Sequence, residues 1–214
     1  MSDRYPGYDV LRKRNSPSWD DKTRDVIDQR LALNAEQHRF FNDLEWQTLK
    51  ALCARIIPQP AERREPAPLA AMIDKKVLSG GDGYRDARLP PMSDAWRQGL
   101  AALEAEARAH FDRSFHLLGG KEQDTLLHKV QQGNVVTSQW RDLKAELFFV
   151  KRVLHDIASA YYAHPSAWNE IGFGGPASPR GYVRMDFDRR DPWEASEAKA
   201  GREQSARREN ERVG

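Results

Sequence analysis

The sequence is poor in cysteine and contains no long apolar run. Cys53 is the only cysteine among 214 residues, so an internal disulfide is impossible and a zinc site with four thiolates is excluded. No stretch of about 18 apolar residues occurs, so no transmembrane helix is predicted. The basic run at residues 11–14 is followed by polar residues, whereas a secretory signal needs an apolar stretch there. We therefore expect neither a membrane span nor a signal peptide.

The chain also carries no strong net charge of either sign. Its formal net charge is +2, and its basic and acidic residues are interspersed. A nucleic-acid-binding surface usually requires clustered basic residues, so we expect no nucleic-acid partner. The length suits one domain with tails better than two domains.

Residue patterns that would indicate catalysis are missing as well. No Gly-x-Ser-x-Gly motif is present, and no Glu-x-x-His pair of the kind used by di-iron bundles occurs. Glu106 and His110 could share a helix face, but one such pair does not make a metal site. We interpret the neighbouring acidic residues Asp20–Asp21 and Glu104/Glu106 as solvated helix faces. The sequence thus predicts no catalytic residue, no cofactor-binding residue and no metal ligand.

Apolar periodicity predicts an all-α fold, a single irregular bundle of about five helices with loop-rich arms. Asn42 and Glu45 are spaced as a capping box for the first strong helix, and Cys53 on its apolar face is expected to pack in the core. Ser93 is the expected cap of the third helix. The longest helix should bury Leu143, Leu147, Val150, Leu154, Ile157 and Tyr161. The expected helices are residues 43–57, 69–78, 93–111, 122–131 and a long one after Ser138 that ends near Ala163.

Composition divides the chain into four parts. Residues 1–38 resemble an N-terminal arm with one short helical stripe, and residues 39–163 form the helical domain. Residues 164–193 are rich in glycine, proline and aromatic residues without a sustained period. Residues 194–214 are charged and lack large apolar side chains, which predicts a disordered tail or a frayed helix.

The segment HPSAWNEIGFGGPASPRGYVR, residues 164–184, is the most distinctive part of the sequence. A phosphate-binding loop would need a strand before the glycines and a helix after them, whereas here a helix is predicted before them and prolines follow. A plain surface loop would leave several aromatic side chains in water. We interpret the segment as an anchor on another protein. The expected interface residues are His164, Trp168, Asn169, Glu170, Phe173, Gly174, Gly175, Arg180, Tyr182 and Trp193.

Three stretches carry a family resemblance: FFNDLEWQTLKALCARIIPQ at 40–59, GYRDARLPPMSDAWRQGLAALEAEARAHF at 83–111, and YYAHPSAWNEIGFGGPASPRGYVR at 161–184, with DPWE at 191–194. Together they resemble the subunit 3 (gamma subunit) family of gluconate 2-dehydrogenase, a bacterial family. The resemblance covers roughly residues 40–194.

The resemblance implies a role in a complex. The large subunit of such complexes belongs to the glucose–methanol–choline oxidoreductases, holds FAD and oxidises a sugar or sugar acid, and a cytochrome c subunit often accepts the electrons. The small subunit carries no cofactor and supports assembly, stability or export of the FAD subunit. The chain is therefore expected to be non-catalytic on its own. Its interface residues would dock on the large subunit, and an N-terminal arm with Tyr5, Tyr8 and Trp19 would wrap it.

The N-terminus departs from the family pattern, because exported members usually begin with a twin-arginine leader and this one is polar. We expect a cytoplasmic protein, or a periplasmic one if a partner carries the export signal. Two other hypotheses remain: a stand-alone helical enzyme or ligand-binding protein with a pocket between helices, and a helical scaffold with no oxidoreductase partner. Burial of Trp168 and Phe173 in the chain's own core would weaken the interface hypothesis.

Overall fold

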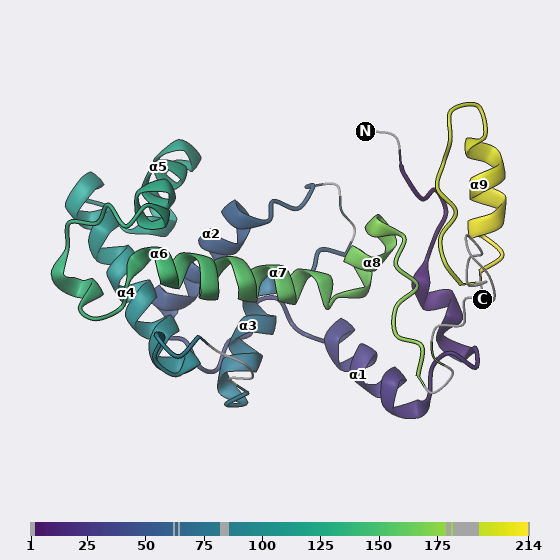
Figure 1. Cartoon of the computed structure of the whole chain (residues 1–214), viewed down its shortest axis with the longest axis horizontal. Helices are drawn as coiled ribbons and strands as arrows, with labels where there is room; N and C mark the ends of the chain where they lie inside the picture. The colour runs from purple at the N-terminus through teal and green to yellow at the C-terminus, as the bar shows by residue number, and fades with distance from the viewer. Residues whose placement is uncertain are drawn as a thin grey trace. The chain divides into compact units, whose positions relative to one another are not determined.

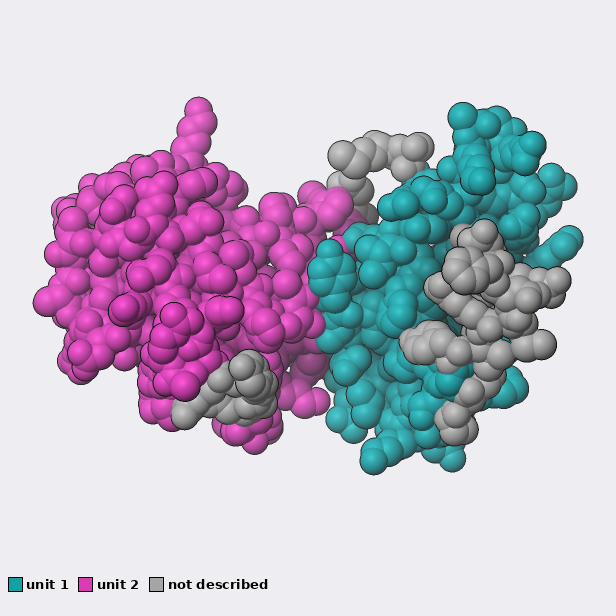
Figure 2. Space-filling view, viewed as in Figure 1, with its two compact units in different colours: residues 1–32, 162–214 teal, residues 33–161 magenta. Residues whose placement is uncertain are grey.

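The computed structural model describes residues 3–61, 63, 65–81, 86–178, 181 and 193–213. These residues divide into two compact units (Figure 2): unit 1 comprises Met1–Ala32 with Tyr162–Gly214, and unit 2 comprises Leu33–Tyr161. The expected all-α class is confirmed, since the described residues form helices and a single isolated bridge between Trp19 and Ser178. None of the helices within the described residues combines the length and apolar character that crossing a membrane requires.

Unit 2 contains most of the helices (Figure 1). Its first half holds α2 (Asp43–Ile56), α3 (Leu69–Leu78) and α4 (Met92–Phe111). Its second half holds η2 (Phe115–Leu117), α5 (Gly120–Gln131), η3 (Ser138–Trp140), α6 (Ala145–Phe148), the π-helical stretch η4 (Phe149–Leu154) and α7 (His155–Tyr162), which ends at the boundary of the unit.

The starts of α2 and α4 test the two predicted caps. The capping box at α2 is confirmed, because Asn42 Oδ1 accepts from Glu45 N at 2.9 Å and Glu45 Oε2 accepts from Asn42 N at 2.9 Å. The predicted cap at Ser93 is wrong. Helix α4 begins at Met92, two residues before the start that a cap at Ser93 implies, and it follows Pro91, which has no backbone N–H to satisfy and makes no side-chain cap.

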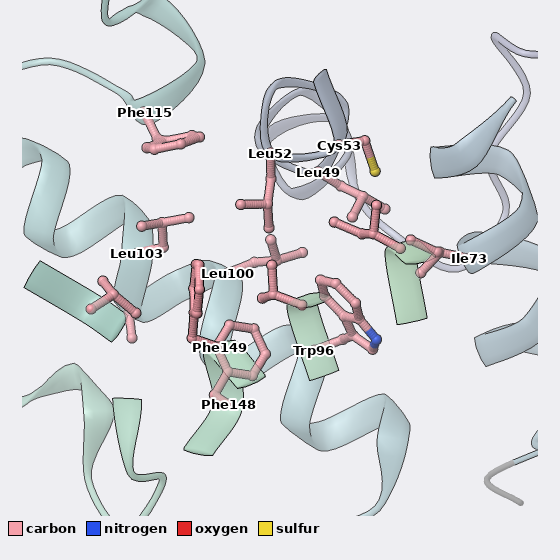
Figure 3. Close-up of a cluster of buried hydrophobic side chains, with 14 of the residues drawn as sticks. Leu49, Leu52, Cys53, Ile73, Trp96, Leu100, Leu103, Phe115, Phe148 and Phe149 are labelled. Carbon is pink, nitrogen blue, oxygen red and sulfur yellow. The ribbon is translucent and has the colours of Figure 1, made fainter. Parts of the chain in front are cut away.

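The core of unit 2 is built on α2 and α4 (Figure 3). Leu49, Leu52 and Trp96 are at most 2% exposed, and the ring of Phe148 stacks edge-on against Trp96 with centroids 5.6 Å apart. A Cβ on Gly99 would lie 2.2 Å from that ring, so only glycine lets α4 come so close. The packing of Phe148 on Trp96 and Gly99 therefore fixes how closely α4 and α6 approach each other.

The predicted long helix after Ser138 is interrupted. Arg141 has a positive φ of 49°, which ends η3, and the helix restarts at Ala145. Its π-helical stretch then shifts the register by about one residue. As a result Phe149 and Val153 are buried, whereas Val150, which the regular period placed in the core, is 45% exposed.

Two acidic residues on α4 lie in the interior, so their interpretation as a solvated face is wrong. Glu106 is fully buried and accepts from Thr137 N at 2.7 Å, from Val136 N at 3.0 Å and from Trp140 Nε1 at 3.2 Å. Glu104 accepts from Phe115 N at 3.0 Å. A buried carboxylate is tolerated only where donors surround it. These two residues satisfy loop amides and hold loops against α4.

Cys53 is 5% exposed in the core of unit 2, as the sequence predicts. Burial raises the pKa of its thiol well above the usual range, since the apolar surroundings disfavour the thiolate. At pH 8 we expect Cys53 to react with a disulfide reagent at least about tenfold more slowly in the native protein than in urea, because each unit of raised pKa removes about nine-tenths of the thiolate. Equal rates in the two states would contradict this burial.

Unit 1 joins both ends of the chain. It contains η1 (Val10–Asn15), α1 (Asp21–Leu31), α8 (Pro165–Ile171) and α9 (Glu203–Asn210). The segments that composition describes as arms and a tail therefore belong to one unit, and the tail contains α9, a helix of the kind left open as the alternative to disorder. Helix α9 buries residues that composition alone does not single out, namely Ala206, Asn210 and, just beyond the helix, Val213.

Candidate partner interface

The segments that were expected to hold a partner instead share one apolar core inside unit 1. Its buried members come from the N-terminal segment, from α8 and from the C-terminal segment. Tyr5, Leu11 and Trp193 are partly buried against them. The buried residues are Tyr8, Val10, Trp19, Ile27, Trp168, Ala195 and Val213.

Trp168 lies at the centre of this arrangement. It is 3% exposed, and its Nε1 donates to the carbonyl of Tyr162 at 2.6 Å. Phe173 packs edge-on against its ring, with centroids 5.9 Å apart at 88°. Gly175 has a positive φ of 66°, and a Cβ there would lie 3.2 Å from the ring. Trp168 is thus a core side chain of this protein, which accounts for the aromatic–glycine pattern around it.

Hydrogen bonds join the N-terminal segment to the segment around α8. Asn169 Oδ1 accepts from Val10 N at 2.8 Å, and Trp19 Nε1 donates to the Pro176 carbonyl at 2.8 Å. Close by, Asp20 N donates to the Ser178 carbonyl at 2.9 Å. Asn169, expected at an interface, therefore satisfies a backbone amide of its own chain.

The C-terminal segment is joined in the same way. The Tyr8 hydroxyl donates to the Trp193 carbonyl at 2.7 Å. Asn210, which is fully buried, donates through Nδ2 to the carbonyls of Pro6 at 3.0 Å and Ser196 at 2.9 Å. Because an unsatisfied buried amide is costly, these bonds specify how the two chain ends pair.

His164 and the nearby glycines have structural positions too. His164 is 4% exposed and caps α8, with Pro165 at the first helical position. Pro165 thus starts α8, a short helix that the sequence did not predict. Gly174 is buried, and a Cβ there would lie 3.4 Å from the Trp193 carbonyl.

Only part of the predicted interface faces solvent. Phe173 is 40% exposed, Ile171 beside it is 46% exposed, and Glu170 is exposed. The Tyr5 ring covers Gly172, the left-handed residue that ends α8, where a Cβ would lie 2.6 Å from the ring. We name Tyr5, Ile171 and Phe173 the α8 patch. The remaining predicted residues, Arg180 and Tyr182, lie outside the described residues.

Unit 2 has an open pocket of about 280 Å³ beside Cys53. Its walls are mainly apolar, and Lys50 Nζ lies 2.6 Å from Glu36 Oε2 among its lining residues. Among the described residues no group of three or more His, Cys, Asp and Glu side chains could hold a metal ion. The pocket therefore offers space for a small apolar group, with one ion pair among its walls.

Comparison with known proteins gives one match. The family model described as gluconate 2-dehydrogenase subunit 3 matches residues 43–175, which is more than half of the chain. The matched region runs from the start of α2 to Gly175 and includes α8. No curated protein and no solved structure gives a significant match. On this match, the chain belongs to the gluconate 2-dehydrogenase subunit 3 family.

Proposed function

We propose that the protein is the non-catalytic small subunit of a flavin-dependent sugar or gluconate dehydrogenase complex, in which it binds the FAD-containing large subunit and supports its assembly and stability. The observation that carries this proposal is the family match over residues 43–175. A protein that binds only the folded large subunit stabilises that subunit through mass action. A cytochrome c subunit that accepts the electrons is part of the same proposal.

The α8 patch supports docking best: Phe173 belongs to the predicted interface and Tyr5 to the N-terminal arm that was expected to wrap the partner, whereas Ile171 is added because it is exposed. Ile171 and Phe173 present apolar surface to solvent, while Trp168 behind them is locked by its own hydrogen bond and packing. Exposed apolar side chains on a rigid base lose little conformational entropy on binding, which favours their use as anchors. Glu170 adds a charge at the edge of the patch.

The test is a co-purification. The tagged chain is expressed with a candidate FAD-containing large dehydrogenase subunit from the same genome, and the visible spectrum of the eluate is recorded. We expect flavin absorbance to elute with the tagged wild-type chain. The double variant Ile171→Ser/Phe173→Ser should lose most of that absorbance, because it removes exposed anchors without emptying the core.

A control removes two apolar side chains elsewhere that are at least as exposed as Ile171 and Phe173. Leu117 is 62% exposed and Val136 is 67% exposed, both in unit 2. The variant Leu117→Ser/Val136→Ser should retain the flavin. A wild-type chain that elutes colourless and alone would refute the proposed function, and equal flavin loss in both double variants would refute the α8 patch as the docking site.

Burial of Trp168 in the chain's own core favours a second candidate, a stand-alone helical ligand-binding protein. Such a protein needs a ligand pocket, and the open pocket beside Cys53 in unit 2 supports this hypothesis. In the co-purification it would behave as a colourless, monodisperse species whether or not the large subunit is present.

A further inference from the structure

One face of α1 borders a pocket of about 200 Å³ within unit 1. Thr23, Val26, Ile27 and Arg30 follow the helical spacing of three and four residues, so they lie along one side of α1. Pro176 and Ser178 also line the pocket, together with Asp20 and Lys22 near the start of the helix. The pocket therefore has an apolar middle and a guanidinium toward the C-terminal end of α1.

Arg30 differs from the other arginines near α1. Arg14 is paired with Asp28, and Arg24 Nη2 lies 2.6 Å from Asp21 Oδ1. Arg30 Nη1 donates to the Ala163 carbonyl at 2.9 Å, yet no carboxylate of the described residues lies within ion-pair distance of it.

The charge of Arg30 is thus poorly compensated. Burial lowers the pKa of its guanidinium, and no neighbouring charge offsets that effect. Arginine nevertheless stays protonated at neutral pH, so the cost of partial desolvation persists in the free protein. A carboxylate placed against the guanidinium would remove that cost and form two parallel hydrogen bonds.

The other charged groups of the pocket lie near the start of α1, away from Arg30, and leave the Arg30 end without a counter-charge. Asp20 caps α1, with its Oδ1 accepting from Thr23 N at 2.8 Å, and hydrogen bonds from Thr23 lower the pKa of that carboxyl group. The Asp20 carboxylate is therefore committed to the helix start. Lys22 contributes a second cation to the lining.

We propose that this pocket binds a carboxylate carried on a short apolar group. The carboxylate pairs with the Arg30 guanidinium, and the apolar group lies against Val26, Ile27 and Pro176. Val26 is 41% exposed, so it offers apolar surface that such a ligand would cover. A free aliphatic monocarboxylic acid and the C-terminal carboxylate of a peptide with an aliphatic last residue share this chemistry. The proposal does not depend on the proposed function.

The test is a titration of the full chain followed by NMR at the arginine Nε–Hε groups and the valine and isoleucine methyl groups. The probes are hexanoate for the free acid and N-acetyl-leucyl-leucine for the peptide terminus, with hexanol and hexylamine as uncharged and cationic controls. We expect at least one carboxylate probe to change the chemical shifts of Arg30 Nε and of the Val26 and Ile27 methyl groups in a saturable way. The tighter of the two identifies the source of the carboxylate.

Substitutions separate a charge pair from plain apolar binding. Arg30→Gln should lower the affinity for the carboxylate probe by about tenfold or more, which is the loss typical of a charge-assisted hydrogen bond. Arg30→Lys should lower that affinity less. Arg208→Gln is the matched control, because Arg208 is exposed on α9 and bonds only to the Gln204 carbonyl among the described residues. The proposal is overturned if hexanol binds wild type as tightly as hexanoate does, or if no carboxylate probe moves Arg30. Both of these outcomes are measured on the wild-type chain, so they do not depend on whether a variant folds.

Discussion

Replacing Trp168 by alanine is expected to unfold unit 1 while unit 2 stays folded. The side chain is 3% exposed, and removing a buried tryptophan costs about 3–5 kcal/mol because the cavity is only partly refilled. Unit 1 has a small core, so this loss is comparable to all the stability that such a unit possesses. Its N-terminal and C-terminal segments would separate, since both pack on that core.

Hydrogen exchange measured segment by segment checks this result. Amides of α1, α8 and α9 should lose protection in Trp168→Ala, whereas those of α2 and α4 should keep it. Phe173→Ala is the control, because that ring is 40% exposed and its removal should change protection in unit 1 only slightly. Retained protection of α9 in the Trp168 variant would show that the segments hold together without this core.

This result bears on how an interface can be mapped. A Trp168 variant that fails to retain a flavoprotein would report an unfolded unit 1 and not a lost contact, since the side chain faces the chain's own core. The α8 patch avoids the ambiguity, because Ile171 and Phe173 are exposed and their loss removes little core packing. Docking and folding are therefore tested by different residues that lie a few positions apart.

The sequence predicted what depends on local periodicity. The capping box at Asn42 and the bounds 69–78 of α3 were correct, because caps and apolar stripes act within a few residues. In the predicted long helix after Ser138, Leu143, Leu147 and Ile157 are buried as predicted, but Val150 and Leu154 are not, because the π-helical stretch has no signal in an apolar pattern of threes and fours. Phe149 and Val153 are buried instead, whereas Val150 is exposed and Leu154 is only partly buried.

Unit 1 could not be predicted for a different reason. Its core joins residues more than 150 positions apart, such as Val10 with Asn169 and Pro6 with Asn210. No periodic pattern in the sequence predicts such pairings. These segments were therefore interpreted from their composition as arms and a tail. Trp168 was expected to anchor on a partner, but a tryptophan in a segment without a sustained period is equally consistent with an internal anchor, and here it is internal.

Replacing Asp156 by alanine is expected to destabilise unit 2 by about 3–5 kcal/mol, the typical cost of removing one partner from a buried ion pair. Its carboxylate is 1% exposed and accepts from Trp96 Nε1 at 3.0 Å, from Lys76 Nζ at 3.1 Å and from Arg152 Nη1 at 3.3 Å. Arg152 is itself 3% exposed, so the substitution leaves a buried guanidinium without this counter-charge.

Urea unfolding followed by circular dichroism measures this cost. Asp142→Ala is the matched control, because Asp142 is exposed and should change stability by less than about 0.5 kcal/mol. The double variant Asp156→Leu/Arg152→Met removes both charges, and replacing a buried ion pair with apolar side chains is often close to neutral. It should therefore be more stable than Asp156→Ala alone. If it is less stable, Arg152 contributes to stability through contacts other than the one with Asp156, and an uncompensated guanidinium is not the main cost of Asp156→Ala.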